Sequence, residues 1–441
     1  MKDRIKRIVK EERAFLIFLF VSMFLMAAGI IWVYHVKVLN APKVYSDGFG
    51  YFAYLPAILY GDFQFDFVQN LEHPLKLIQV DGGVVNKYPV GVAIMESPFF
   101  FAAHVLSLLR DALTGSATAT GYSNLYQYFV LFGGVVYWAA GTVLLYRLMV
   151  RYLDLSRKIA CITCILITYG TNLFHYASYD AGFSHVYSYA VLNLFLYYLC
   201  WYEERDKTEK NTPLHTCVFG ILAGVIFLIR NVNIIFVLTY ILYGVRDWRS
   251  LKERAVTVLK PSRVLPIVGA GIITILPQMF YWHAATGHWF LYSYGSNESF
   301  FWLKPEMINF LFSVRKGLFF WSPILFVSMA GIVYAYKNRS KLYTGSVLFL
   351  ILILYISAAW WCWYYGGSYG QRVVVDFMCI FAVGMAALLD GPCRKRRPLR
   401  FMVYGYCGLC VVWNCICTLA YWYHVIPSDG TTWENIRSII R

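Results

Sequence analysis

The sequence predicts an all-α protein that crosses a membrane about eleven times and forms one transmembrane domain over residues 1–441. Of its 441 residues, 59% are apolar and only 14% are charged, a balance that excludes soluble globular and disordered chains. Apolar runs of about 20 residues recur from end to end, and each is long enough to cross the hydrocarbon core as a helix. Short basic clusters separate these runs, which is typical of cytoplasmic loops.

The first apolar run, residues 14–34, predicts a helix that stays in the protein. It is too long for the core of a signal peptide and is not followed by a small-residue cleavage site. With the N-terminus on the cytoplasmic side, this helix leads outward. The further crossings are expected at residues 125–149, 159–174, 183–201, 214–229, 232–245, 264–282, 318–336, 342–361, 373–390 and 401–424.

Residues 89–109 are also long enough to cross, but this run contains Glu96 together with a proline and a histidine. If it crossed, the basic cluster at residues 151–158 would lie outside, against the usual charge distribution. We therefore expect a re-entrant or surface-lying helix. Residues 35–124 then form one long exported loop, and such loops are rarely without structure. We expect membrane-lying helices at residues 47–59 and 89–109.

Arg230 and Asn231 interrupt an apolar stretch that is too long for a single crossing. As one helix this stretch would extend over about 45 Å at 1.5 Å per residue, so we expect two short helices with a turn between them. A short pair does not reach the outer surface, and Arg230 is expected to lie recessed below it. An arginine in that position needs an anionic partner.

The net charge of +15 suggests nucleic-acid binding at first sight. Because the basic residues lie in the predicted cytoplasmic loops, their charge orients the protein in the membrane, and no nucleic-acid partner is expected. The eleven cysteines lie mostly inside apolar runs, where they pack as small hydrophobic residues. Neither a metal-binding site nor a disulfide framework is predicted.

The predicted exported side collects polar residues at the ends of helices, where their side chains can converge on one cavity at the outer membrane face. An aromatic run, residues 360–365, lies on the same side and is suited to stacking on sugar rings. The candidate cavity residues are Asp47, Tyr51, Tyr54, Lys87, Tyr88, Glu96, Asp180, His185, Arg230, Arg315, Gln371 and Arg372.

Each of these residues also has a purely structural interpretation. The aromatic residues are typical of the belt at a membrane interface. Arg372 and Asp376 are four residues apart and would pair on one face of a helix. Arg315 would lie in a solvated turn, His185 would be a hydrogen-bonded core histidine, and Asp180 would cap the following helix.

A cavity that binds a lipid phosphate carrying a sugar needs few chemical groups. Phosphate is a good leaving group, so one carboxylate suffices to take the proton from an acceptor hydroxyl. Cations must hold the phosphate and stabilise the charge that grows on it. A glycoside hydrolase would prefer two facing carboxylates, and no carboxylate adjoins Asp47 in the sequence. The absence of a nucleotide-binding motif fits a donor carried by a lipid.

Three segments carry a resemblance to a known superfamily. They are residues 46–56 (SDGFGYFAYLP), 87–91 (KYPVG) and 366–372 (GGSYGQR). An aspartate in the first exported loop, membrane-lying helices and Lys-x-Pro before the second of them resemble the GT-C fold glycosyltransferases. Protein O-mannosyltransferases and the lipid A aminoarabinose transferase belong to this superfamily, and the segments look like those of a bacterial branch.

The resemblance implies a polyprenyl-phosphate-linked sugar as donor, inversion at the anomeric carbon and Asp47 as general base. It also implies a bacterial cytoplasmic membrane, with membrane lipids around the protein and the site facing the periplasm or cell exterior. Lys87, Arg230, Arg315 and Arg372 are then candidate phosphate-binding residues. O-mannosyltransferases carry Asp-Glu at the catalytic position, whereas Gly48 follows Asp47 here. The acceptor (glycan, lipid or protein) and the use of a divalent cation therefore stay open, and no metal ligand is assigned.

Two other functions use the same lipid-linked substrates. A transporter or flippase would show an inverted repeat, paired half-helices and charges at the bilayer midplane, but the chain has no visible repeat. A glycan polymerase or ligase shares the transfer chemistry and differs in moving an oligosaccharide.

Overall fold

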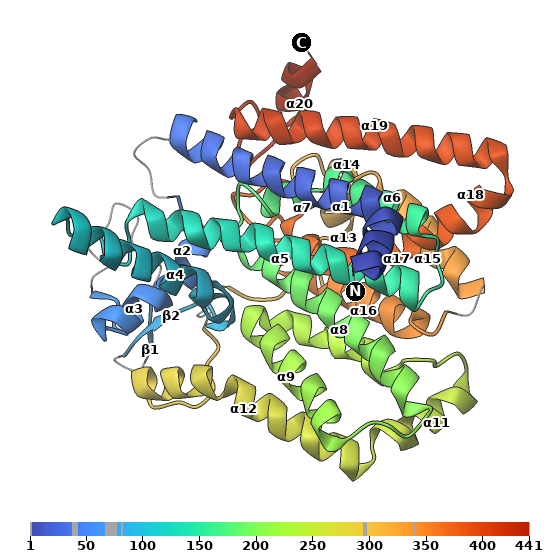
Figure 1. Cartoon of the computed structure of the whole chain (residues 1–441), viewed down its shortest axis with the longest axis horizontal. Helices are drawn as coiled ribbons and strands as arrows, with labels where there is room; N and C mark the ends of the chain where they lie inside the picture. The colour runs from blue at the N-terminus through green and yellow to red at the C-terminus, as the bar shows by residue number, and fades with distance from the viewer. Residues whose placement is uncertain are drawn as a thin grey trace.

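The computed structural model describes residues 2–37, 43–66, 77–80, 83–293, 298–337 and 340–440. The chain is an all-α, multi-pass membrane protein, with one short β-hairpin among the residues described (Figure 1). Six helical segments of the described chain are long and apolar enough to cross a membrane, and shorter apolar helices accompany them. The total of about eleven crossings stays a prediction.

The helices follow most of the predicted apolar runs, but the expected helices 232–245 and 373–390 begin with 3₁₀ turns. In the first half of the chain they are α1 (Lys2–Ile31), α4 (Gly91–Thr114), α5 (Asn124–Arg151), α6 (Arg157–Gly170), α7 (Leu173–Tyr176), α8 (Ser184–Asp206) and α9 (Pro213–Ile229). In the second half they are α10 (Leu238–Ile241), α11 (Trp248–Val258), α12 (Pro261–Thr286), α13 (Met307–Phe312), α14 (Leu318–Trp321), α15 (Leu325–Lys337), α16 (Tyr343–Ala359), α17 (Met378–Asp390), α18 (Pro392–Lys395), α19 (Arg397–Trp422) and α20 (Trp433–Ile440).

The outer surface of the helices is apolar, as a lipid environment requires. Helix α12 shows this most clearly, because Leu265, Ile273 and Phe280 are all exposed along it. Apolar surface of this extent on a monomer marks contact with a membrane or a partner. A set of polar residues nevertheless lies inside the bundle, where His185 and Asp376 are almost completely buried.

The segment between α1 and α5 starts and returns at the same end of the bundle (Figure 1). It contains α2 (Ser46–Phe52), α3 (Tyr54–Tyr60), the hairpin of β1 (Leu77–Val80) and β2 (Gly83–Asn86), and α4. Helices at residues 47–59 and 89–109 were expected and are present. Parts of the predicted 35–124 loop, residues 38–42, 67–76 and 81–82, lie outside the described chain. Helix α4 is long enough to cross a membrane, so its re-entrant or surface-lying placement stays a prediction.

The predicted interruption at Arg230 is confirmed. Helix α9 ends at Ile229, Arg230 has an extended backbone, and a 3₁₀ helix, η3 (Asn231–Val237), follows. A second interruption was not predicted, because the expected helix at 318–336 is divided between α14 and α15. Pro323 explains this break, since proline lacks an N–H group and disfavours a helical conformation in the residue before it.

Candidate active site

A cavity of about 480 Å³ is lined by residues of α2, α9, η3, α12, α16 and the 3₁₀ helix η4 (Arg372–Phe377). Its charged lining residues are Asp47, Lys87, Arg230, Glu298 and Arg372. The rest of the lining is mainly apolar and aromatic, and it includes Phe227, Ile229, Val232, Trp282, Phe290, Leu291, Ile353, Ile356, Trp360 and Phe377. This combination suits a ligand with a charged head and an apolar chain.

Close backbone contacts place Asp47 at the cavity. Asp47 lies in the first turn of α2, followed by Gly48 and Gly50. A Cβ atom at Gly50 would come within 2.0 Å of the Tyr88 ring, and one at Gly48 within 3.1 Å of the carbonyl oxygen of Gly182. The glycines of the SDGFGY motif therefore let α2 lie directly against these two neighbours.

Both carboxylate oxygens of Asp47 are engaged. The Tyr88 hydroxyl donates to Oδ1 at 2.7 Å, and Nη2 of Arg372 lies 2.9 Å from Oδ2. Burial raises the pKa of the Asp47 carboxyl, but Arg372, the Tyr88 hydroxyl and Lys87 together outweigh burial and hold it below the ordinary value of 3.8. Burial and the adjacent carboxylate raise the pKa of the Tyr88 hydroxyl. Asp47 is therefore ionised and Tyr88 is protonated at neutral pH.

Lys87 forms the next part of the lining. Its Nζ lies 3.2 Å from Oε1 of Glu298, and its carbonyl oxygen accepts a hydrogen bond of 2.8 Å from the Ser293 hydroxyl. The preceding residue, Asn86, donates to the carbonyl oxygen of Gly50 at 2.7 Å. The Lys-Tyr-Pro segment is thus connected to α2 and to the segment after α12. Sequence reasoning missed Glu298; its only signal was a carboxylate in a predicted exported segment.

Arg230 has an anionic partner, as predicted, while its placement below the outer membrane surface stays a prediction. Its Nε lies 3.3 Å from Oδ2 of Asp376, and Asn233 donates to the same oxygen at 2.6 Å. Nδ1 of His185 lies 2.7 Å from the other oxygen, Oδ1. Asp376 is completely buried, so one carboxylate holds groups from α8, the end of α9 and η3.

The structure rules out the alternative interpretation in which Arg372 pairs with Asp376, since Arg372 pairs with Asp47. That interpretation assumed an α-helix, in which residues four apart share a face. Residues 372–377 instead form a 3₁₀ helix. With three residues per turn, positions four apart point in different directions.

The structure places six of the predicted cavity residues in the lining and six outside it. Those in the lining are Asp47, Tyr51, Lys87, Tyr88, Arg230 and Arg372. Those outside it are Tyr54, Glu96, Asp180, His185, Arg315 and Gln371.

The residues outside the lining have other partners. Arg315 lies over the ring of Tyr364 and makes two bonds of 3.0 Å to Asp429. The completely buried Glu96 accepts a hydrogen bond of 3.2 Å from Tyr187. Tyr54 and Gln371 donate to main-chain carbonyl groups, of Tyr88 at 2.7 Å and of Trp363 at 3.2 Å, and so support the segments around the cavity.

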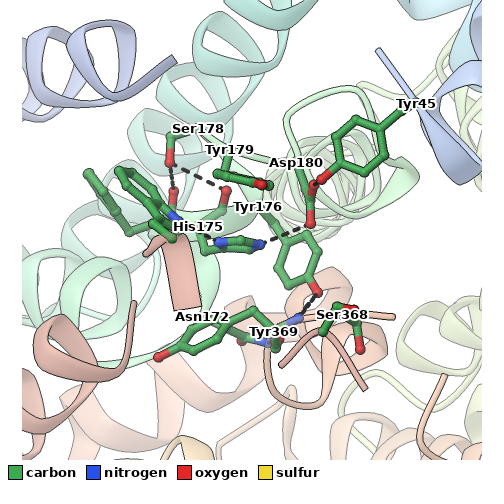
Figure 2. A network of polar contacts seen from close by, with 12 residues as sticks. Tyr45, Asn172, His175, Tyr176, Ser178, Tyr179, Asp180, Ser368 and Tyr369 are labelled. Atoms are coloured by element: carbon green, nitrogen blue, oxygen red, sulfur yellow. Dashed lines mark hydrogen bonds and ion pairs between the residues drawn. The ribbon is translucent and has the colours of Figure 1, made fainter. Parts of the chain in front are cut away.

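Asp180 is buried in a polar network with Tyr45 and His175 (Figure 2). It accepts hydrogen bonds from Tyr45 and His175, and its side chain does not cap α8, whose N-cap is Phe183.

Within the described ranges, no group of three or more His, Cys, Asp or Glu side chains is arranged to hold a metal ion. The oxygens of Asp47 face a guanidinium and a hydroxyl. The cavity lining thus has two carboxylates, Asp47 and Glu298, beside three cations, an arrangement that can bind an anion and accept a proton next to it.

No protein-family model and no curated protein matches the sequence. The fold is similar to solved structures of an archaeal oligosaccharyltransferase from Archaeoglobus fulgidus. The structure of AglB in complex with an inhibitory peptide and a dolichol-phosphate has a TM-score of 0.49 and 13% identity, over 94% of this chain and 56% of that chain. The apo form has a TM-score of 0.48 and 14% identity, over 91% and 55%. This chain thus spans little more than half the length of those proteins.

Proposed function

We propose that the protein is a GT-C type membrane glycosyltransferase that transfers a sugar from a polyprenyl phosphate to an acceptor hydroxyl, with Asp47 as general base. The observation that carries this proposal is the position of Asp47. It lines one cavity together with Lys87, Arg230 and Arg372, and its carboxylate is ionised beside a guanidinium. The sequence motifs around residues 46–56 and 87–91 support the same reaction.

In the proposed step, the acceptor oxygen attacks the anomeric carbon of the sugar from the side opposite the phosphate. The bond between the anomeric carbon and the phosphate oxygen breaks, and its electron pair leaves with the polyprenyl phosphate. The acceptor proton moves to a carboxylate oxygen of Asp47. Negative charge grows on the departing phosphate, where Arg372, Arg230 and Lys87 stabilise it.

The charge balance of the cavity favours a donor with a single phosphate. Each of the three cations has a carboxylate partner, because Lys87 pairs with Glu298, Arg230 with Asp376 and Arg372 with Asp47. An incoming anion must share these cations with the protein's own carboxylates. A phosphodiester brings one negative charge, whereas a diphosphate brings two and meets stronger repulsion.

The apolar part of the lining supports a lipid carrier. Phe227 and Ile229 of α9, together with Ile353 and Ile356 of α16, face the same cavity as the cations. These side chains are about as apolar as lipid, so a prenyl chain can pass from the bilayer into the cavity without being exposed to water. A water-soluble sugar nucleotide would not use these side chains.

A reconstitution experiment tests the proposal. The purified protein in liposomes is incubated with synthetic polyprenyl-phosphate sugars and with glycan, lipid or peptide acceptors, and free polyprenyl phosphate and glycosylated product are measured. We expect acceptor-dependent release with the native chain. Asp47→Asn should lower turnover at least 1,000-fold, on the order of what loss of a catalytic base costs. Asp62→Asn, a change in the same predicted loop, outside the cavity lining, should retain turnover.

The alternatives give different results. Movement of intact donor across the liposome membrane, without release of lipid phosphate, would indicate a flippase. Release from diphosphate donors alone would contradict the inference from charge balance. Full activity of Asp47→Asn would exclude Asp47 as the base.

A further inference from the structure

A chain of hydrogen bonds inside the protein ends at Tyr45 (Figure 2), two residues before Asp47 in the sequence. Nε1 of Trp422 donates to Nδ1 of His175 at 2.9 Å. Nε2 of His175 lies 2.9 Å from Oδ2 of Asp180, and the Tyr45 hydroxyl donates to Oδ1 of Asp180 at 2.7 Å. His175 is completely buried and Asp180 is 4% exposed. Ionisable side chains buried this deeply, outside the cavity lining, call for an explanation.

The partners of His175 determine where its proton lies. The indole N–H of tryptophan is only a donor, so Nδ1 of His175 must be an unprotonated acceptor. The proton of the neutral imidazole is then on Nε2, which donates to Asp180. The carboxylate of Asp180 therefore receives one hydrogen bond from His175 and one from Tyr45.

This chain of hydrogen bonds ends at a sharp change in backbone direction. Tyr45 is extended, with φ −143° and ψ 173°. Ser46 has a φ of +52°, a conformation that residues other than glycine adopt only when surrounding contacts impose it. Helix α2 begins at Ser46, and Asp47 follows. The bend is held from the far side as well, because Gly48 packs closely against Gly182.

We propose that Asp180 is a positioning residue for Asp47, and that it acts by holding Tyr45 so that the strained bend at Ser46 directs Asp47 into the cavity. His175 and Trp422 orient the Asp180 carboxylate for this task. The inference rests on the proposed role of Asp47 as base. It gives Asp180 a role outside the cavity, since the residue does not line it.

The test compares Tyr45→Phe with a matched control. Tyr45→Phe removes only the hydroxyl that binds Asp180, and Tyr189→Phe removes another buried hydroxyl, which contacts Thr142 at 3.2 Å. We expect Tyr45→Phe to lower kcat about tenfold or more, as for loss of a hydrogen bond to a charged group, while the KM for the donor changes less than about threefold. Tyr189→Phe should leave both constants unchanged. Equal effects of the two variants, or a change confined to KM, would overturn the proposal.

Rescue provides a second readout that general destabilisation would not produce. Glycine adopts a positive φ without steric cost. In Ser46→Gly the bend therefore depends less on the hydrogen bond between Tyr45 and Asp180. The double variant Tyr45→Phe/Ser46→Gly should recover most of the kcat lost in Tyr45→Phe. Asp180→Asn keeps the size of the side chain and should show the same loss of kcat. Absence of rescue in the double variant would contradict positioning through Ser46.

Backbone amide exchange separates this inference from the proposed function. Tyr45→Phe should accelerate hydrogen–deuterium exchange in α2 (Ser46–Phe52), and Tyr189→Phe should not. If the native chain transfers no sugar but exchange in α2 rises in Tyr45→Phe, the proposed function is wrong. The inference that Asp180 and Tyr45 stabilise α2 is then still supported. If the native chain transfers sugar and exchange in α2 is unchanged in Tyr45→Phe, the positioning role of Asp180 is wrong and the proposed function is unaffected.

Discussion

The carboxylate of Asp47 and the guanidinium of Arg372 form an ion pair, with Oδ2 and Nη2 2.9 Å apart. Both residues line the cavity, and their side chains are 27% and 12% exposed. In the proposed reaction the donor phosphate must therefore compete with the base for the same cation. As the phosphate takes up part of the charge of Arg372, the Asp47 carboxylate loses part of its stabilisation and becomes more basic.

Arg372→Ala should weaken donor binding more than it weakens the fold. Loss of a charged hydrogen-bond donor to phosphate is expected to raise the KM for the donor about 10- to 100-fold. Arg315→Ala is the matched control, because Arg315 pairs with Asp429 and lies outside the cavity lining. Steady-state kinetics on both variants measure the effect. Equal KM values for the two variants would mean that Arg372 does not bind the donor.

Asp376→Asn should destabilise the protein strongly. Loss of the charge removes the buried carboxylate that pairs with Arg230 and disturbs the bonds to His185 and Asn233. Breaking such a buried pair costs about 3–5 kcal/mol.

Unfolding in mixed detergent–SDS micelles measures this cost. Glu253→Gln is the comparison, because its pair with Arg249 is highly exposed, at 65% and 90%, and an exposed pair contributes about 0–1 kcal/mol. In addition, Asp376→Asn/Arg230→Gln should cost less than the sum of the two single changes, since the residues are in contact. Strict additivity would mean that the pair does not form.

The pH dependence of transfer should reflect the lowered pKa of Asp47. Burial raises this pKa, but Arg372, the Tyr88 hydroxyl and Lys87 lower it by more than burial raises it. The net result is a pKa below 3.8. The folded state thus favours the carboxylate, and the resulting stabilisation is present above the ordinary pKa and is lost as pH falls through the folded value. We expect kcat/KM to show no acid limb from Asp47 at or above about pH 5.

Arg372→Ala should move that acid limb to higher pH, because burial still raises the pKa of Asp47 and the main opposing charge is gone. The dependence of kcat/KM on pH, measured for the native chain and the variant, checks this. An acid limb at the same pH in both proteins would assign it to another group.

Gly91→Ala should destabilise the start of α4. A Cβ atom there would lie 2.3–2.6 Å from main-chain atoms of Leu228 and Ile229, which cannot move aside as a flexible side chain can. Overpacking of this kind costs about 1–3 kcal/mol. Gly408→Ala in α19 is the control, since no atom lies within 4 Å of its Cβ position, and it should stabilise by up to about 1 kcal/mol. SDS unfolding of both variants measures the difference, and equal effects would contradict close packing at Gly91.

Local sequence patterns predicted the helices well. Apolar run lengths located α5, α8 and α16, and the polar pair Arg230–Asn231 marked the end of α9. Three expected helices differ in the structure. Pro323 divides 318–336 between α14 and α15, and the helices expected at 232–245 and 373–390 begin as the 3₁₀ helices η3 and η4. These features depend on neighbouring residues only, so they can be derived from the sequence directly.

The sequence alone determined that this chain is a membrane protein and pointed to the candidate residues Asp47, Lys87, Arg230, Arg315 and Arg372, because ionisable groups are exceptional in so apolar a chain. Only the tertiary structure decided that Arg372 meets Asp47, that Arg230 meets Asp376, that Glu298 lines the cavity and that Arg315 lies outside it. The partners in each ion pair come from segments far apart in the chain. Their distance is set by how helices pack against one another, and the period of an apolar run carries no information about that distance.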